Sequence, residues 1–172
     1  MTIARRLVVT TGADALTVSA VAERAGVKAP SLYKHFADRL ALLKAVEIEV
    51  LGELERALRA GTKGTTPRLR IASMAATYRA FATEQPLRYG VIYSRDAADD
   101  PGIAEACLQA ARPLFEELEK AGMAPERILP VSRTLTAFLH GFVSMEIVNA
   151  FRLGGDVDEA FEDGLKTVLA AV

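Results

Sequence analysis

The stretch "VAERAGVKAPSLYKHFADRLALL", from Val21 to Leu43, decides the fold. Upstream of its first glycine, apolar residues recur at helical spacing: Val18, Val21, Ala22 and Ala25. Thr17 precedes them and suits the N-cap position, and Gly26 suits the end of the helix because it adopts positive φ at no steric cost. Leu32 and Phe36 lie four residues apart, so they share the buried face of a further short helix. The pattern predicts two short helices joined by a glycine turn.

The exposed face of the second of these helices is unusual because it carries hydrogen-bonding groups: Ser31, Tyr33, Lys34 and His35. Such side chains bond to base edges and phosphates in a DNA major groove. Ala22 and Ala25 would keep the preceding helix thin where the two cross, and Val27 would fill the space between them. The stretch therefore predicts a helix-turn-helix DNA-binding unit.

Composition favours an all-α chain. The 172 residues are 51% hydrophobic and 25% charged, as in ordinary globular proteins, with glycine and proline at intervals rather than in tracts. Cys107 is the single cysteine, which excludes an intrachain disulfide and a thiolate metal cluster. The N-terminal stretch lacks the apolar core of a signal peptide, and no apolar run could span a bilayer. We expect a cytoplasmic protein with no membrane partner, no cofactor and no metal.

Charge is divided between the two parts of the chain. Residues 1–47 carry seven basic and four acidic side chains, a net charge of +3, whereas the remainder carries 14 basic and 18 acidic ones, a net charge of −4. A basic front and an acidic remainder indicate an anion-binding module joined to a part with another task.

Apolar periodicity and helix-stop residues predict the remaining elements. Asp38 can cap a helix that begins at Arg39 and buries Leu42, Leu43 and Val46. A loop is expected at 60–67, and 87–94 could be helical or extended. Further helical patterns cover 3–11, 39–58, 68–85, 102–122 with a kink at Pro113, 125–155 and 156–171.

At this point the chain resembles a known family. Residues 17–46, "TVSAVAERAGVKAPSLYKHFADRLALLKAV", look like the DNA-binding signature of the TetR/AcrR transcriptional regulators, including the glycine turn, the Leu-Tyr-x-His-Phe segment and the Asp-Arg that follows. The resemblance implies an all-α fold in which a three-helix helix-turn-helix domain, 1–47, is joined to a helical-bundle effector-binding and dimerisation domain, 48–172.

Carried over by position, the resemblance also assigns DNA contacts. The recognition face comprises Lys28, Pro30, Ser31, Tyr33, Lys34 and His35. Thr17 becomes a phosphate-contacting cap, Arg39 contacts the DNA backbone, and Pro30 also suits the first turn of its helix. Lys28 stands where the family often has a capping Ser or Thr, so a less firm helix start is expected. The basic arm that commonly precedes the first helix is nearly absent, which predicts lower phosphate affinity.

Effector-site candidates lie in the body, on helical patterns rich in aromatic residues: Met74, Tyr78, Phe81, Tyr89, Tyr93, Phe115, Phe138 and His140. Most residues of this kind are plain core, and the tyrosines are the better candidates because a buried hydroxyl needs a partner. His140 is either a ligand-binding or switch residue or a packed side chain satisfied by one hydrogen bond.

The last two helical patterns resemble a subset of the family in their "FLHGFVSMEI" and "DEAFEDGLKTVL" segments, although Phe138-Leu139 stands where a tryptophan-containing stretch is common. In that family these helices form a four-helix dimer interface. The expected interface residues are Leu139, Phe142, Val143, Ile147, Phe151, Phe161, Leu165 and Val168. The small residues Gly141, Ser144 and Ala150 and the apolar residues up to Phe151 suit close helix approach and are too many for one monomer to bury. A two-fold dimer is therefore predicted, with recognition helices about 34 Å apart.

The resemblance implies a homodimeric repressor that binds a palindromic DNA operator and is released by a small-molecule effector of unknown identity. One alternative is a helical binding module whose DNA binding is weak or lost. Another is a helical enzyme that uses His140 with Glu146 or Glu116, but no nucleophile signature, metal-ligand set or phosphate loop accompanies them. We therefore expect no enzymatic activity.

Overall fold

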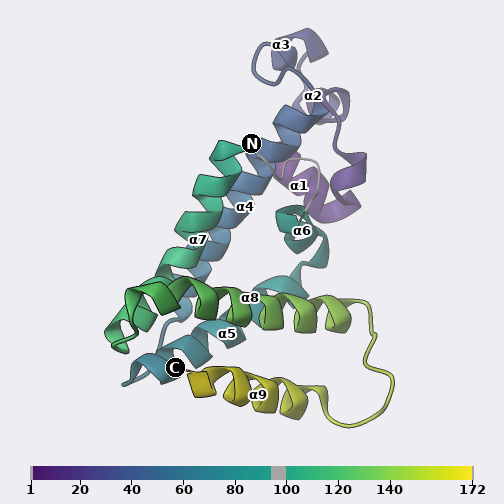
Figure 1. The fold of residues 1–172 in the computed structure, drawn as a ribbon. Helices are drawn as coiled ribbons and strands as arrows, with labels where there is room; N and C mark the ends of the chain where they lie inside the picture. Colours follow the sequence, from purple (N-terminus) through teal and green to yellow (C-terminus); the bar gives the residue numbers. More distant parts are fainter. Residues whose placement is uncertain (1, 94–99, 172) are drawn as a thin grey trace. The chain divides into compact units, whose positions relative to one another are not determined.

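The computed structural model describes residues 2–93 and 100–171, and every regular element within these ranges is helical (Figure 1). The elements are α1 (Thr2–Thr11), η1 (Ala13–Ala15), α2 (Val18–Ala25), α3 (Ala29–Tyr33), α4 (Arg39–Gly61), α5 (Pro67–Glu84), α6 (Pro86–Gly90), η2 (Val91–Tyr93), α7 (Pro101–Lys120), α8 (Pro125–Ile147), α9 (Val157–Val168) and η4 (Leu169–Ala171). The all-α prediction is confirmed. None of the helices in the described ranges is long and apolar enough to cross a membrane.

Two units divide the chain. The first comprises residues 1–53 and 85–109, and the second comprises 54–84 and 110–172, so α4 and α7 each contribute to both. The expected functional boundary after residue 47 concerns DNA and effector binding, and it stays a prediction.

The first unit is built on α1 and the N-terminal part of α4. α1 buries Ala4, Leu7 and Val8, and it packs against α2 and α6. The predicted inner face of α4 is confirmed, since Leu42, Leu43 and Val46 are at most 1% exposed. Arg5 of α1 and Arg88 of α6 both form ion pairs with the Glu53 carboxylate of α4. These charges join three helices of the unit.

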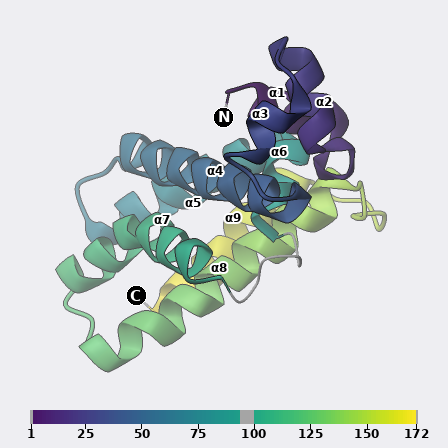
Figure 2. The same cartoon turned by 90° about the horizontal axis from the view of Figure 1, so that it is seen from above.

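The second unit is held by the packing of α8 against α5 and α9 (Figures 1 and 2). Aromatic rings fill the space between α8 and α9: the Phe142 ring lies 5.1 Å from that of Phe161, and the Phe138 ring lies 5.9 Å from it. Gly164 of α9 allows this approach, because a Cβ there would lie 2.6 Å from the Phe138 ring.

Local signals explain most helix ends, with one difference from the predictions. The helix predicted over 125–155 ends at Ile147, because Asn149 adopts a left-handed φ of 53° and Ala150 N–H bonds to the carbonyl of Met145. The segment left open between helix and extended chain is helical as α6 and η2 up to Tyr93, and its last residue lies outside the described residues. α7 runs through Pro113.

Candidate nucleic-acid interface and effector pocket

The glycine turn after α2 has the predicted geometry. Thr17 Oγ1 accepts a hydrogen bond from Ala20 N–H at 3.0 Å, which caps the helix. At the other end Gly26 has a φ of 67°, and Val27 N–H reaches back to the Ala22 carbonyl at 3.0 Å. Both ends of α2 are therefore fixed by the residues that the sequence indicated.

α3 is a short helix that begins without a side-chain cap. Lys28 occupies the N-cap position and provides no capping bond, as its departure from the family pattern predicted. Pro30 lies in the first turn, where its fixed φ suits a helix start. The backbone N–H groups of His35 and Phe36 both bond to the Leu32 carbonyl at 2.9 Å, so the turn that follows continues the same local winding.

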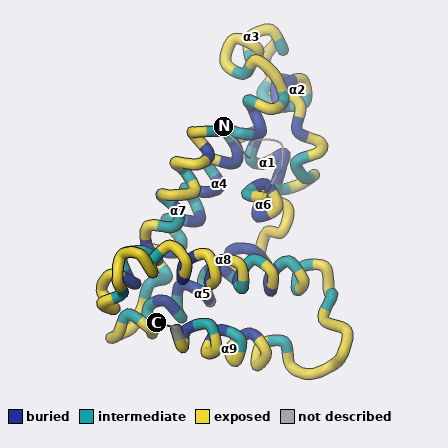
Figure 3. The backbone as a smooth tube through the Cα atoms, in the orientation of Figure 1, coloured by how far each residue is buried: buried dark blue, intermediate teal, exposed yellow. Residues whose placement is uncertain are grey.

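The six residues predicted for the recognition face are all exposed, and Figure 3 shows the α3 segment mostly in the exposed colour. Tyr33, for example, is 51% exposed. Neither Lys28 nor Lys34 forms an ion pair with any residue that the structure describes. This segment thus presents cations without carboxylate partners, beside a phenol and a hydroxyl.

The inner side of α3 is less buried than predicted. Leu32 and Phe36 are half-buried rather than buried. The prediction that Val27 fills the space between the helices is wrong, because its side chain is 45% exposed. The left-handed turn at Gly26 ends α2 just before Val27, and none of the residues of α3 is fully buried.

Thr17 and Arg39, the expected phosphate contacts, differ in their surroundings. Thr17 is exposed beyond its capping bond. Arg39 donates from Nη2 to the Ala13 carbonyl at 3.0 Å and lies 3.9 Å from Asp14 Oδ1, so it links the start of α4 to η1. Asp38 caps α4 as predicted, accepting from Ala41 N–H at 2.7 Å.

A buried carboxylic acid lies further along α4 and was missed in the sequence. Glu47 is 2% exposed, and its Oε2 has no hydrogen-bond partner among the residues that the structure describes. Burial, and secondarily the negative charge of Asp100, raise the pKa of Glu47 to about 7. Leu43 and Leu51, four residues away on either side, are both buried. This position within an apolar stripe is the signal that could have revealed it.

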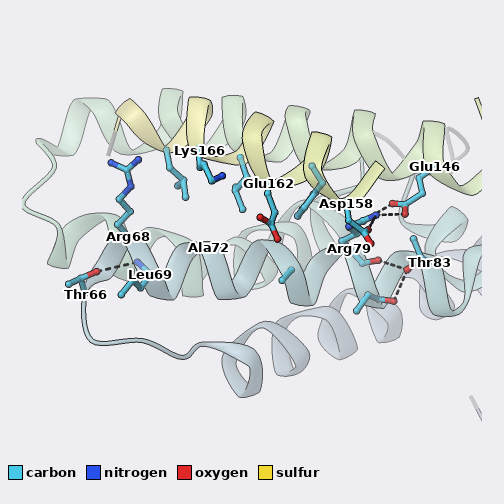
Figure 4. A pocket seen from close by; sticks show the side chains of 15 residues that line it. Thr66, Arg68, Leu69, Ala72, Arg79, Thr83, Glu146, Asp158, Glu162 and Lys166 are labelled. Atoms are coloured by element: carbon cyan, nitrogen blue, oxygen red, sulfur yellow. Dashed lines mark hydrogen bonds and ion pairs between the residues drawn. The ribbon is translucent and has the colours of Figure 1, made fainter. Parts of the chain in front are cut away.

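The second unit contains a groove of about 810 Å³ between α5 and α9 (Figure 4). Its lining residues are Thr66, Arg68, Leu69, Ala72, Ala76, Arg79, Ala80, Thr83, Glu146, Asp158, Phe161, Glu162, Leu165, Lys166 and Leu169. The volume is in the range of small-molecule sites, which are mostly apolar with a few polar groups. The alanines at four-residue spacing on α5 were the available sequence signal for this space.

At one end of the groove lies an arginine with two acidic partners. Arg79 lies 2.6 Å from Glu146 Oε1 and 2.7 Å from Asp158 Oδ1, and its guanidinium lies 4.8 Å from the centre of the Phe161 ring. The hydrogen bonds to Glu146, and secondarily to Asp158, raise the pKa of Arg79 above its ordinary value. Arg79 is therefore fully compensated and joins three helices.

Two families of known proteins match this chain, one in its N-terminal part and one in its C-terminal part. The family described as "Bacterial regulatory proteins, tetR family" matches residues 1–46, and "Tetracyclin repressor-like, C-terminal domain" matches residues 71–168. The chain belongs to the TetR family. Its helix-turn-helix and helical C-terminal part are those of a transcriptional regulator.

Individual relatives agree with this membership. An uncharacterized HTH-type transcriptional regulator of Mycobacterium tuberculosis, Rv0681, is 31% identical over 153 residues, which are 88% of this chain and 70% of the relative. A TetR variant from Acinetobacter baumannii AYE, in complex with minocycline, is 25% identical with a TM-score of 0.70, covering 99% of this chain and 92% of its own. The Streptomyces coelicolor TetR SCO7222 has a TM-score of 0.78 at 18% identity, over 99% and 93% of the two chains, and shows the fold alone.

In this TetR-family chain, none of the eight effector-site candidates lines the groove between α5 and α9. Met74, Tyr78 and Phe81 are buried on other positions of α5. Tyr89 and Tyr93 belong to the first unit, where their ring centres lie 5.4 Å apart. The remaining candidates, Phe115, Phe138 and His140, are half-buried in the second unit. Their role in ligand binding stays a prediction.

His140 has the surroundings of a packed side chain. Its Nδ1 lies 3.4 Å from Ser144 Oγ, one turn further along α8, and burial lowers the pKa of the imidazole.

Most residues predicted for the dimer interface are buried within a single chain, contrary to the expectation that one monomer could not bury them. One chain does bury five of the eight residues within its own second unit: Leu139, Phe142, Val143, Phe161 and Leu165. Ile147 and Val168 are half-buried, and Phe151 is 37% exposed. The buried face of α8 is occupied by α5 and α9 of the same chain. A different face of α8 is exposed, formed by Arg133, Ala137, Gly141 and Met145, with Val148 at the C-cap of the helix.

Proposed function

We propose that this TetR-family regulator is a homodimeric repressor that binds a palindromic operator through α2 and α3 and leaves it when a small molecule binds the C-terminal domain. In this proposal residues 1–47 form the DNA-binding domain and 48–172 the effector-binding and dimerisation domain. The single observation that carries DNA binding is the exposed α3 segment, whose lysines have no carboxylate partner among the described residues.

Each predicted DNA contact has a chemical task in the proposal. Lys28 and Lys34 neutralise phosphates, while Ser31 and His35 bond to base edges and Tyr33 packs on a thymine methyl group. Pro30 shapes the first turn of the helix. Thr17 and Arg39 contact the DNA backbone.

The exposed face of α8 supports dimerisation. It is defined by Arg133, Ala137, Gly141 and Met145 of α8 and by Val148 at its C-cap, which follow one another at three- or four-residue spacing. The small side chains of Ala137 and Gly141 allow a second helix to approach closely, and the apolar Met145 and Val148 gain from burial. A two-fold axis through this face would present two copies of α3 to successive half-sites.

Effector binding is supported by the groove in the second unit and by the minocycline complex of the 25% identical TetR variant. A ligand that binds better to the conformation unable to hold DNA shifts the population toward it, which is how release would follow.

A catalytic role finds no support in the carboxylates first considered for it. Glu116 is paired with Arg59 and Glu146 with Arg79, and His140 bonds to Ser144. We propose that the chain is a cytoplasmic, non-enzymatic regulator.

An electrophoretic mobility shift assay tests the proposal, with palindromic DNA from the intergenic region next to the gene that encodes this chain. We expect a retarded band at low salt that disappears with excess specific competitor. Failure to shift any such DNA at low salt would favour the alternative, a helical small-molecule-binding module that has lost DNA binding.

A further inference from the structure

The groove between α5 and α9 has an apolar middle. On α5 it is lined by three alanines in successive turns, Ala72, Ala76 and Ala80, whose small side chains leave the space open. On α9 the facing residues are Phe161 and Leu165. A volume of about 810 Å³ with these walls suits an apolar body of drug size or smaller.

The two ends of the groove differ in charge. At one end Arg79 is already compensated by Glu146 and Asp158. At the other end Arg68 extends from α5 toward the side of the groove where Lys166 lies (Figure 4). Arg68 forms no ion pair with any residue in the described ranges, whereas Lys166 bonds to Asp163 at 2.9 Å. An uncompensated positive charge therefore lies at this end.

The backbone strengthens the same end. α5 begins at Pro67, directly before Arg68, and Thr66 Oγ1 lies 3.3 Å from Leu69 N as a cap. The N-terminus of this 18-residue helix contributes partial positive charge beside the guanidinium. Two cations and a helix N-terminus around an open volume form a favourable site for one anionic group.

Glu162 limits what the rest of the ligand can be. Its side chain lines the groove between Lys166 and Asp158 on α9 (Figure 4). A second negative charge along the ligand body would meet this carboxylate and be repelled. The apolar walls likewise disfavour a charged body.

From these features we infer that the α5–α9 groove binds an amphipathic organic monoanion, with its anionic head at Arg68 and Lys166 and its uncharged apolar body along the alanines of α5. That this ligand is the effector which releases DNA rests on the proposed function. Binding itself requires no DNA.

The test uses the purified full chain and three probes of equal chain length: decanoate and decylammonium, each below its critical micelle concentration, and decanol below its solubility limit. Isothermal titration calorimetry should give a dissociation constant for decanoate about tenfold lower than for decanol, since one charge-assisted head contact has that effect, and the weakest binding for decylammonium. Equal binding of decanoate and decanol would overturn the assignment of the anionic head.

Variants locate the ligand. Arg68→Gln combined with Lys166→Gln should weaken decanoate binding about tenfold and leave decanol binding unchanged, while Arg127→Gln, an exposed charge outside the groove, should change neither. Ala76→Phe should abolish binding of both probes by filling the volume, and Ala76→Leu, with its unfolding transition checked by circular dichroism, should weaken both. Decanoate affinity unaffected by these groove variants would overturn the inference.

A separate DNA measurement distinguishes this inference from the proposed function. If decanoate binds as described and operator DNA stays bound, the groove inference holds and the effector role proposed for it fails. If operator DNA is bound but no variant or probe shows an anion in the groove, the inference fails and DNA binding stands.

Discussion

Arg79 of α5 donates two hydrogen bonds to the Glu146 carboxylate of α8, from Nε at 2.8 Å and from Nη2 at 2.6 Å. The same guanidinium contacts Asp158 at the start of α9 and lies over the Phe161 ring. Both members of the main pair are mostly buried, with side chains 18% and 24% exposed. Removing one partner would leave the other charge poorly solvated.

Replacing Arg79 with Met should therefore lower the free energy of unfolding by about 2–4 kcal/mol in urea titrations, because Glu146 loses a bidentate partner. Arg59→Met is the matched control. Arg59 pairs with Glu55 and Glu116 but is 43% exposed, so its loss should cost less than about 1 kcal/mol. Equal losses in the two variants would show that burial of the Arg79 pair has no energetic weight.

Gly164 is predicted to be required for the contact between α9 and α8. An added Cβ would lie 2.6 Å from the Phe138 ring, so Gly164→Ala should destabilise the chain by about 1–3 kcal/mol despite the better helix propensity of alanine. Gly90→Ala, at an exposed position of α6 where no neighbouring atom of the described residues lies within 4 Å of an added Cβ, should be neutral or stabilising. Thermal unfolding followed by circular dichroism measures both. A stable Gly164→Ala variant would contradict the close packing.

Glu47 should make stability depend on pH. Its pKa in the folded chain, about 7, is above the ordinary value of 4.5, so the folded state retains a proton that the unfolded state releases. The contribution of Glu47 to the free energy of unfolding is therefore most favourable below about pH 4.5. It falls as the pH rises from 4.5 through about 7 and then levels off. Glu47→Gln should remove this loss and stabilise the chain at pH 8 by about 1–3 kcal/mol relative to wild type, with little change at pH 4.5. Urea unfolding at the two pH values gives the comparison, and an unchanged difference between wild type and variant would refute it.

The exposed face of α8 should control the oligomeric state. Ala137→Glu places a charge in the middle of that face and should convert a dimer to a monomer in sedimentation equilibrium. Ala104→Glu, an identical change at an exposed position of α7, should leave the dimer intact. If the dimer survives Ala137→Glu but dissociates with Phe151→Glu, the interface instead includes Phe151, the exposed residue of the set predicted from the sequence.

Local signals were sufficient for the helix-turn-helix but not for the body. The caps at Thr17 and Asp38 and the turn at Gly26 depend on neighbours within four residues, so the sequence predicts them directly. Arg79 meets Glu146 across 67 positions, and the groove exists only because α5 and α9 are brought together. No periodicity reveals such pairings.

The residues predicted for the dimer interface could not be assigned from the sequence for a different reason. Leu139 and Phe161 have the apolar spacing expected of an interface, yet they are buried inside one chain. A residue packed against its own chain and one packed against a partner obey the same apolar pattern. Only the observed packing identifies the other face of α8 as the exposed one.

DNA binding through α3 is the central claim, and its salt dependence is the most direct test. Binding of a palindromic operator, measured by fluorescence anisotropy from about 50 to 200 mM salt, should give a log–log slope that Lys34→Ala makes shallower by about 0.9 on each protomer, because one phosphate contact is lost. Lys63→Ala, an exposed lysine in the loop between α4 and α5, should keep the wild-type slope. Identical slopes for wild type and both variants, or no binding at low salt, would contradict the account.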